Sequence, residues 1–475
     1  GAWFENTTVE DSTTVGVRLY FVDASTTFRN LTITDSGDPG QGAHEAGLAI
    51  RSSFFAPRFE NLVISGSVGP GVSATSGGAM QGSNWFLHNN SKDGLYIDSS
   101  TVIVDHLHLS DNGESGAHIF DSRYVTLSNL TAIGNGNLGL NELEQAGLFF
   151  EKSNDLESSS GDVTCNHCTV SNSAGSGVVV KDSVDLFLNH LTVENNNPSY
   201  DPITVDNSGL NLGQQGGRFH MHDVLIITER QGTDAGPAIR VNRAAGNIDT
   251  LVLQGNHSGM IWNANNNGNY PSELSRAQLS GTSCLLLIDH SDLTGQDNTI
   301  LPQCTGSVIL QNSQVNWSSF TDLTSSTVIN LDAFSTLHLH QPQQIDFSSA
   351  IIAPSAQIDI AWDIEVWVQN NNSNGIPSAP VGISFDQFEP NAQENTNDIG
   401  YVKFPNFIGQ QWTQSGASPL TTVTVDCTYD GLSNSSSVSL DGDKTIYCIL
   451  PIDNQPPFLY WDLPEGDSIY PSGSL

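Results

Sequence analysis

The chain has 475 residues, with 51 Asp and Glu against 15 Lys and Arg, so its formal net charge at pH 7 is −36. A field of this sign repels nucleic acids and anionic membranes, and it attracts divalent cations. Only 14% of the residues are charged, which excludes a disordered acidic tail, and no run of about 18 apolar residues occurs that would span a membrane. The abundant Gly, Asn, Ser and Thr residues predict many short strands separated by tight turns.

The repeat unit of the chain is clearest in residues 163–195, where one pattern occurs twice. The copies read Val-Thr-Cys-Asn-His-Cys-Thr-Val-Ser-Asn and Leu-Phe-Leu-Asn-His-Leu-Thr-Val-Glu-Asn, so His167 and His190 are equivalent, roughly 23 residues apart. A period of this size predicts a stacked solenoid. The chain begins inside such a repeat without a signal peptide, so we expect that an upstream segment has been removed.

Two positions recur through the first 260 residues. The first, the anchor, precedes the apolar start of a Leu-Thr-Val-like triplet: Asn6, Asn30, Asn61, Asn84, His106, Asn129, His167, His190, Asp223 and Thr250. The second is a glycine that opens another strand: Gly16, Gly47, Gly71, Gly94, Gly116, Gly147, Gly177, Gly209, Gly236 and Gly259. Apolar and polar residues tend to alternate after each glycine, which predicts that the first and third side chains point inward and the second and fourth outward.

Three units carry long insertions at one corner, namely Thr34–Ala46, Gly134–Ala146 and Glu194–Ser208. Each unit has room for about three short strands, but an isolated unit cannot bury its apolar face. Stacked units bury it, with neighbouring strands about 4.8 Å apart. The sequence therefore predicts an all-β fold, a parallel β-solenoid.

Three segments carry a resemblance to a known family: Asn30–Ile33 (Asn-Leu-Thr-Ile), Asn61–Ile64 (Asn-Leu-Val-Ile) and Ser91–Ile97 (Ser-Lys-Asp-Gly-Leu-Tyr-Ile). They resemble right-handed parallel β-helix repeats, which are typical of the pectin-lyase-like superfamily. The resemblance implies a right-handed parallel β-helix over residues 1–350, in which anchor Asn side chains commonly form an internal hydrogen-bonded ladder. Four anchors interrupt the Asn series here: His106, His167, His190 and Asp223. The resemblance specifies a fold rather than an activity.

The sequence pattern changes after the predicted β-helix. Residues 357–368 alternate almost throughout, and with later segments such as 421–425 they predict a β-sandwich over residues 355–452. This part resembles the transthyretin-like or Ig-like modules appended to secreted surface proteins. Residues 453–475 are expected to be a linker and the start of a further module, so we expect a full-length protein that is longer at both ends.

The six cysteines form three pairs that are close in sequence, for which we expect disulfides: Cys165 with Cys168, Cys284 with Cys304, and Cys427 with Cys448. Two core-facing thiols are the alternative for Cys165 and Cys168. Eight sequons permit glycosylation: Asn6, Asn30, Asn89, Asn129, Asn256, Asn316, Asn371 and Asn434. Together these features predict a secreted protein, extracellular or at the cell surface.

The outward positions of the second strands form one stripe. Its second positions on three successive turns are Tyr96, His118 and Phe149, and its fourth positions are Arg51, Thr75, Asp98, Phe120, Glu151 and Lys181. Aromatic faces beside carboxylates suit a polysaccharide, because sugar C–H faces pack on rings while hydroxyls seek charged acceptors. In pectin-lyase-like enzymes the substrate groove likewise runs along one parallel sheet beneath long loops. The ligand-binding candidates are Arg51, Tyr96, Asp98, His118, Phe120, Phe149, Glu151 and Lys181.

Two other interpretations of the stripe stay open. In the structural one, Phe120 and Phe149 pack beneath the second insertion, and Glu151 forms an ordinary ion pair with Lys181. In the catalytic one, Asp98, Glu151 and Lys181 are the candidates, with Asp98 and Glu151 about 9–10 Å apart, at the edge of the range for an inverting hydrolase. The insertion acids Glu142 and Glu144 are further candidate carboxylates. No catalytic motif of the superfamily is present.

The sequence specifies no cofactor. His167 lies within Cys-Asn-His-Cys and would stack on His190, but structural zinc requires four ligands and no second Cys-x-x-Cys occurs. Calcium is the better candidate, because the net charge favours it together with acidic turns such as Asp35–Asp38, or Asp441 and Asp443. No complete calcium-loop motif accompanies these residues.

Three functions are compatible with these observations. The first is a glycan-binding, adhesive or structural stalk protein whose partner is a polysaccharide or cell-surface glycan. The second is a polysaccharide lyase or glycoside hydrolase acting in a groove on the β-helix. The third is a self-assembling extracellular filament or coat subunit, since open solenoid ends expose strand edges that template pairing.

Overall fold

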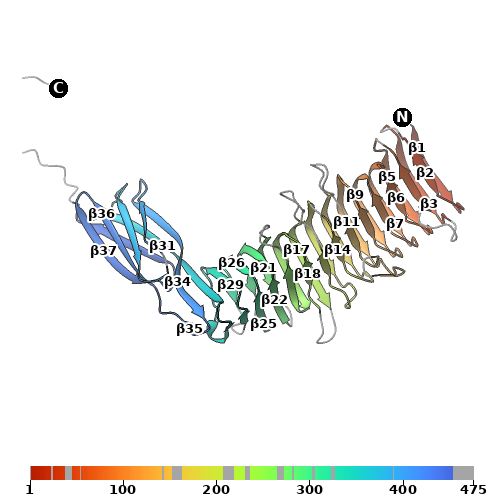
Figure 1. The fold of residues 1–475 in the computed structure, drawn as a ribbon. Helices are drawn as coiled ribbons and strands as arrows, with labels where there is room; N and C mark the ends of the chain where they lie inside the picture. Colours follow the sequence, from red (N-terminus) through yellow and green to blue (C-terminus); the bar gives the residue numbers. More distant parts are fainter. Residues whose placement is uncertain are drawn as a thin grey trace, which may run out of the picture. The chain divides into compact units, whose positions relative to one another are not determined.

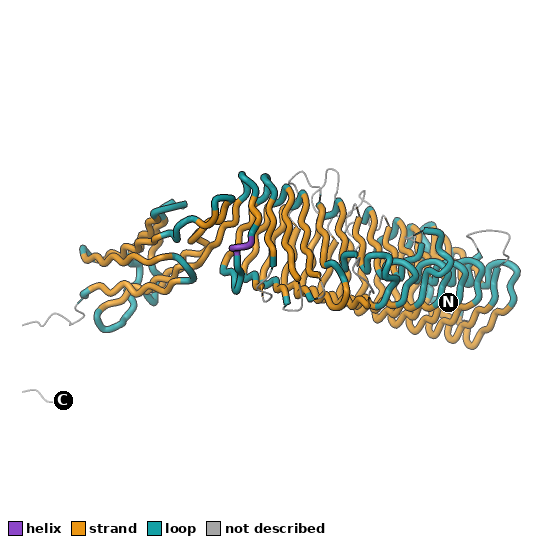
Figure 2. Tube along the Cα trace, turned by 90° about the horizontal axis from the view of Figure 1, so that it is seen from below, coloured by secondary structure: helices purple, strands orange, loops and turns teal. Residues whose placement is uncertain are grey.

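The computed structural model describes residues 2–452 except 23–24, 38–44, 54, 142–143, 152–162, 184, 207–218, 230–235, 265–271, 281–282, 302–304, 323–326 and 389. The described elements are strands apart from one 3₁₀-helix, η1 (Phe347–Ser349) (Figure 2). The chain divides into two compact units, Gly1–Ala361 with Gln410–Pro419, and Trp362–Gly409 with Leu420–Leu475. Among the described residues, no helix has the length and apolar character that crossing a membrane requires.

The first unit is a solenoid in which parallel strands pair from one coil to the next (Figure 1). The strands of its long sheet are β1 Trp3–Glu10, β3 Thr27–Thr34, β5 Arg58–Ser65, β7 Ala79–His88, β9 Thr101–Ser110, β11 Val125–Ile133, β13 Val163–Ser171, β15 Leu186–Glu194, β17 Phe219–Glu229, β19 Gly246–Asn256, β21 Ser272–Leu279, β23 Asp292–Gln296, β24 Thr299–Ile300, β26 Gln314–Ser318, β27 Thr321–Asp322, β29 Thr336–His340 and the start of β31 Gln357–Asn370.

The opposite sheet of the solenoid has 14 described strands, all in parallel register from coil to coil. They are β2 Val17–Tyr20, β4 Leu48–Arg51, β6 Val72–Thr75, β8 Leu95–Asp98, β10 Ala117–Phe120, β12 Leu148–Glu151, β14 Val178–Lys181, β16 Ile203–Asp206, β18 Ile239–Asn242, β20 Gly259–Asn263, β22 Ser283–Asp289, β25 Thr305–Gln311, β28 Val328–Leu331 and β30 Ile351–Ile352. The predicted all-β fold class and the parallel β-helix are confirmed.

The anchor residues bend the long strands that contain them, from β1 to β19. All ten have left-handed backbone conformations, with φ of +55° at Asn30 and +54° at His167 as examples. Asn adopts this region at lower cost than most residues, which explains its recurrence at the bend. The anchors point outward, and Asn6, Asn30, Asn61 and Asn84 form an exposed ladder with Nδ2–Oδ1 distances of 2.7–3.1 Å.

The internal ladder is formed by other residues, which corrects the expectation attached to the anchors. Asn90 and Asn112 lie four residues before their strand-opening glycines, and both are buried. The Asn90 amide donates to Asn112 Oδ1 at 2.9 Å, and the Asn112 amide donates to Asn135 Oδ1 at 2.9 Å. These side chains also bond backbone groups, because Asn112 Oδ1 accepts from the backbone N–H of Asn90 and the Asn112 amide donates to the carbonyl of Leu87.

The opening glycines are needed for close coil-to-coil contact. A Cβ at Gly94 would lie 2.7 Å from the carbonyl oxygen of Gly116, so no larger residue fits without displacing the next coil. Inside, residues in register stack on one another, as in Leu48, Val72 and Leu95, all with no exposed surface. This continuous apolar column is what an isolated coil could not bury.

Two coils depart from the predicted pattern. The strand expected after Gly209 is instead β16, which follows Pro202 and lies within the predicted insertion Glu194–Ser208; Gly209 itself is outside the described residues. The strand expected after Gly236 begins at Ile239, after Ala238. Here other residues precede the strand, so a pattern based on glycine misses the register.

Solenoid pairing also continues beyond residue 350. Thr336–His340 pairs in parallel with Gln357–Ala361, so the first part of β31 is a solenoid strand rather than the opening of a separate module. The predicted linker and further module, residues 453–475, lie outside the described residues.

The second unit has one hydrophobic core to which all its principal strands contribute. Its antiparallel sheet runs β33–β32–β36–β37, and the end of β31 pairs in parallel with β38. The bounds are β32 Pro380–Phe385, β33 Ala392–Asn395, β34 Tyr401–Thr413, β35 Gly416–Ala417, β36 Thr422–Tyr429, β37 Leu432–Ser439 and β38 Lys444–Leu450, with β35 in the first unit. The resemblance to transthyretin-like or Ig-like modules stays a prediction.

Cys427 and Cys448 are both buried in this core as free thiols, which corrects the disulfide expected between them. Their separation in the sequence predicts proximity but cannot show oxidation. The Cys448 thiol donates to the carbonyl of Asn434 at 3.8 Å, and the neighbouring Cys448 thiol together with burial raises the pKa of the Cys427 thiol. The disulfide expected between Cys284 and Cys304 lies outside the described residues, because Cys304 and the side chain of Cys284 are not described.

Candidate functional site

The predicted stripe lies on the outer face of β4 to β14, with the expected register. The fourth positions pair coil by coil in the order Arg51, Thr75, Asp98, Phe120, Glu151 and Lys181. All six side chains are half-buried. Asp98 and Glu151 are two strands apart, which corresponds to about 9–10 Å at normal strand spacing. Arg51 lies on β4, two strands before Asp98, and is not part of the charged cluster described below.

The second positions stack three rings across neighbouring coils. His118 lies 4.5 Å from Phe149, centroid to centroid, and 5.3 Å from Tyr96, which meets it edge-on. Phe149 is only 3% exposed and packs with Ala146 and Val179. This corrects the assignment of Phe149 as a ligand-contacting ring, because it supports His118 from inside a small apolar cluster. Of these three rings, Tyr96 and His118 reach the surface, as does Phe120 at a fourth position, 6.3 Å from His118.

His118 lies between two carboxylates. Its Nδ1 is 3.9 Å from Asp93 Oδ2, and its Nε2 is 3.8 Å from Glu151 Oε2. These distances are too long for hydrogen bonds, and the buried Nε2 has no hydrogen-bond partner among the described residues. Lys181 Nζ contacts the other oxygen of Glu151 at 3.1 Å. The predicted Glu151–Lys181 pair is thus one part of a four-residue cluster.

The two carboxyl groups beside His118 have opposite pKa shifts. The side chain of Asp93 is 7% exposed, and its burial raises its pKa to about 7. The His118 imidazole and then the Lys181 ammonium lower the pKa of Glu151 to about 2. Burial favours the protonated form of Asp93, whereas the neighbouring positive charge favours the carboxylate form of Glu151.

Sequence reasoning did not single out Asp93, although a signal was present. It is the residue directly before a strand-opening glycine, and a carboxylate at that position is unlike the residues of neighbouring coils: Val15, Ala46, Pro70, Ser115, Ala146 and Ser176. An ion pair between Lys92 and Glu114, at 2.9 Å, flanks it on the same edge. Glu144 accepts a hydrogen bond from the backbone of Leu140 within its own insertion, and Glu142 is outside the described residues.

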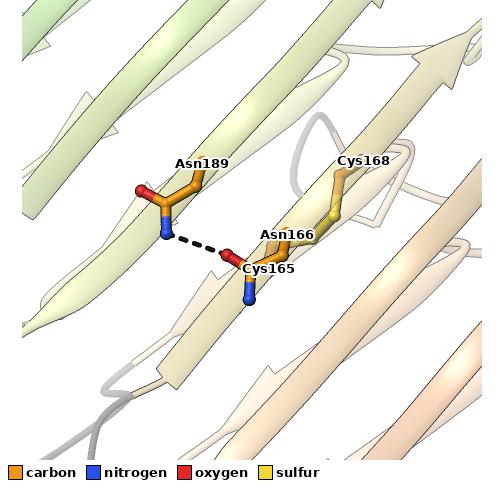
Figure 3. Close-up of a disulfide and its surroundings, with 4 residues drawn as sticks. All are labelled: Cys165, Asn166, Cys168 and Asn189. Carbon is orange, nitrogen blue, oxygen red and sulfur yellow. Dashed lines mark hydrogen bonds between the residues drawn. A yellow bond between two sulfur atoms is a disulfide. The ribbon is translucent and has the colours of Figure 1, made fainter.

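The repeated His pair lies away from this cluster. Cys165 and Cys168 form a disulfide in β13 and are fully buried, so neither sulfur is available as a zinc ligand (Figure 3). His167 is exposed on the outside of the same strand and stacks on His190 at 4.4 Å. Within the described part of the chain, no group of three or more His, Cys, Asp or Glu side chains is arranged to hold a metal ion.

These features define a right-handed parallel β-helix protein. A family model described as the right-handed beta helix region matches residues 46–226. A search of solved structures finds the full-length tailspike protein 2 from Escherichia coli O157:H7 bacteriophage CAB120, at 10% sequence identity and a TM-score of 0.26. The similarity covers 91% of this chain and 56% of the tailspike chain. No curated protein matches the sequence.

Proposed function

We propose that this protein binds a polysaccharide or cell-surface glycan on the outer face of strands β8 to β14. The proposal includes a secreted location and a pectin-lyase-like β-helix, with the second unit as a spacer. The observation that carries it is the alignment of Tyr96 and His118, two half-buried rings, with the charged groups of Asp98 and Lys181. Rings that reach the surface beside fixed charges suit sugar C–H faces and hydroxyls together.

Binding of the purified chain to immobilised acidic and neutral polysaccharides tests this proposal. We expect the double variant Tyr96→Ala with His118→Ala to lose at least tenfold in affinity. Phe86→Ala is the matched control, because Phe86 is also an exposed aromatic ring that contacts a histidine, but on β7 of the other sheet. Unchanged affinity in the double variant would remove this face from consideration.

Glycoside hydrolysis is the second candidate, and the pKa difference between Asp93 and Glu151 favours it. A carboxyl group that keeps its proton near neutral pH is suited to general acid catalysis, and a carboxylate ionised at all ordinary pH values is suited to act as base or nucleophile. His118 lies between the two groups.

Depolymerisation assays separate the two candidates. If the face is catalytic, the wild type shortens a bound polysaccharide, and Glu151→Gln or Asp93→Asn stops this while binding persists. If it is a binding surface alone, polymer length stays constant on incubation with the wild type. Size-exclusion chromatography of the polysaccharide measures the difference directly.

A further inference from the structure

A pocket of about 390 Å³ lies at the carboxyl ends of β8 and β10, on the edge opposite the long insertions. Six residues line it: Ser99, Ser100, Thr101, Asp121, Arg123 and Tyr124. It adjoins the stripe directly, because Ser99 follows Asp98 and Asp121 follows Phe120. No residue of the pocket belongs to the cluster around His118.

The pocket arises from unequal turn lengths in successive coils. Two residues, 99–100, separate β8 from β9, whereas four residues, 121–124, separate β10 from β11. The preceding coil also turns within three residues, 76–78. A Cβ added at Gly77 would meet no atom within 4 Å, so the space on that side is open. The four-residue turn 121–124 therefore projects beyond the shorter turns. We call this turn the wall of the pocket and the short turn 99–100 its floor.

Hydrogen bonds fix the floor of the pocket. Ser100 and Ser122 are buried, and the backbone N–H of Ser100 donates to Ser122 Oγ at 3.2 Å. Ser122 Oγ in turn donates to the carbonyl of Phe120 at 2.7 Å. The wall and the floor are thus tied together before any ligand arrives, and such preorganisation lowers the entropic cost of binding.

The wall presents an aromatic ring beside a carboxylate and a guanidinium. Tyr124 is 52% exposed, and its left-handed backbone, with φ of +54°, turns the side chain out of the strand path. Ser99 Oγ donates a hydrogen bond to Asp98 Oδ1 at 2.8 Å and lies 3.3 Å from Asp121 Oδ2. Arg123 also lines the pocket, and its guanidinium carries N–H donors.

The geometry points to this pocket as a binding subsite for one neutral pyranose residue. This inference rests on the proposed function and extends it. The Tyr124 ring covers the apolar C–H face of the sugar, Asp121 accepts from its hydroxyls, and Arg123 donates to its oxygens. A volume of about 390 Å³ falls at the small end of ligand sites, which suits a single sugar rather than a long segment. The Asp121 carboxylate and the net charge of −36 disfavour a uronate here.

A strand of four residues spans about 13 Å, so one glycan chain can lie across the face from Tyr96 or His118 and place its end in the pocket. The face then holds internal sugars, and the pocket holds a terminal or branching one.

Titration with short neutral sugars tests the pocket alone. Methyl glycosides and trisaccharides of glucose, galactose, mannose and N-acetylglucosamine serve as probes, with trigalacturonate as the acidic comparison, observed by saturation-transfer NMR. We expect at least one neutral probe to bind, and Tyr124→Asn and Asp121→Asn each to weaken it at least fivefold. Asn tolerates the left-handed backbone at position 124, so the first variant keeps the turn.

Tyr20→Ala is the matched control, since Tyr20 is a similarly exposed tyrosine on β2. If no short neutral probe binds, or if both pocket variants bind a probe as tightly as the wild type does, the proposed subsite is wrong. The double variant Tyr96→Ala with His118→Ala reports on the proposed function separately, because it weakens polysaccharide binding and leaves the methyl glycosides, which are too short to reach the face from the pocket, unaffected. If only that double variant has an effect, the face binds glycan without the pocket.

Discussion

The buried carboxyl group of Asp93 makes stability depend on pH. Its pKa is about 7 in the folded protein against an ordinary value of 3.8, because burial penalises the charged form more than nearby His118 and Lys92 stabilise it, with Glu114 adding to the penalty. Between pH 4 and 7 the folded chain therefore binds more protons at this residue than the unfolded chain. The free energy of unfolding falls as pH rises through that window, by at most about 4 kcal/mol for about three pKa units.

We expect Asp93→Asn to remove this penalty. The variant should be more stable than the wild type at pH 8, while the two should be alike at pH 4, as measured by urea unfolding of the solenoid. Glu151→Gln is the matched control with the opposite sign, because the lowered pKa of Glu151 stabilises the fold at every pH above its ordinary value of 4.5. A constant difference between Asp93→Asn and the wild type from pH 4 to 8 would contradict the argument.

At the level of the strands, the internal ladder is the feature with the largest expected cost on substitution. Asn112 has no exposed surface, donates to Asn135 Oδ1 and to the carbonyl of Leu87, and accepts from Asn90. Asn112→Ala leaves several buried polar groups without partners, and each unpaired group lowers the free energy of unfolding by about 1–3 kcal/mol. We expect a loss of about 3 kcal/mol or more in the free energy of unfolding.

Asn61→Gly provides the comparison for that prediction. Asn61 belongs to the exposed ladder, donates to Asn30 and accepts from Asn84, and glycine retains its left-handed backbone. Because water replaces the lost bonds there, a loss below about 1 kcal/mol is expected from the same unfolding measurement. Equal losses in the two variants would show that burial does not distinguish the ladders.

The two ladders also show where sequence reasoning succeeds and where it stops. Period-two alternation fixed the facing of Tyr96 and Asp98 correctly, because one side of the strand must meet an apolar core. The recurrent Asn at the bend was expected inside, but it is selected for its left-handed backbone and faces water. The local sequence does not distinguish an Asn that occurs because its backbone is left-handed from an Asn that occurs because its side chain bonds a buried carbonyl group.

The candidate site was predictable in part for the same reason. Register placed Glu151 beside Lys181 and stacked His118 on Phe149, since both contacts follow from strand alternation alone. The burial of Phe149 against Ala146 agrees with the structural interpretation of the stripe, in which this ring packs beneath the second insertion. The environment of Asp93 depends instead on side chains from neighbouring turns, which no pattern within one coil encodes. Those long-range contacts set the pKa of Asp93.

For the whole molecule, the charge of −36 is the dominant electrostatic term. Fifteen basic side chains cannot pair with 51 acidic ones, so the folded chain experiences net self-repulsion that salt screens. We therefore expect Tm to rise when NaCl is increased from about 20 to 300 mM, although individual ion pairs such as Lys92–Glu114 weaken under the same conditions. A falling Tm would mean that local pairs outweigh the general repulsion.

The same measurement tests the calcium binding that the acidic turns of the sequence predict. CaCl₂ and MgCl₂ at matched ionic strength screen charge alike, so any general effect is common to both cations. A specific calcium site binds the folded state alone and adds about RT ln(1 + [Ca]/Kd) to stability, which makes Tm depend on calcium concentration. We expect millimolar calcium to raise Tm above the magnesium value. Coincident curves for the two cations would assign the whole effect to screening and exclude calcium as a structural ligand of this chain.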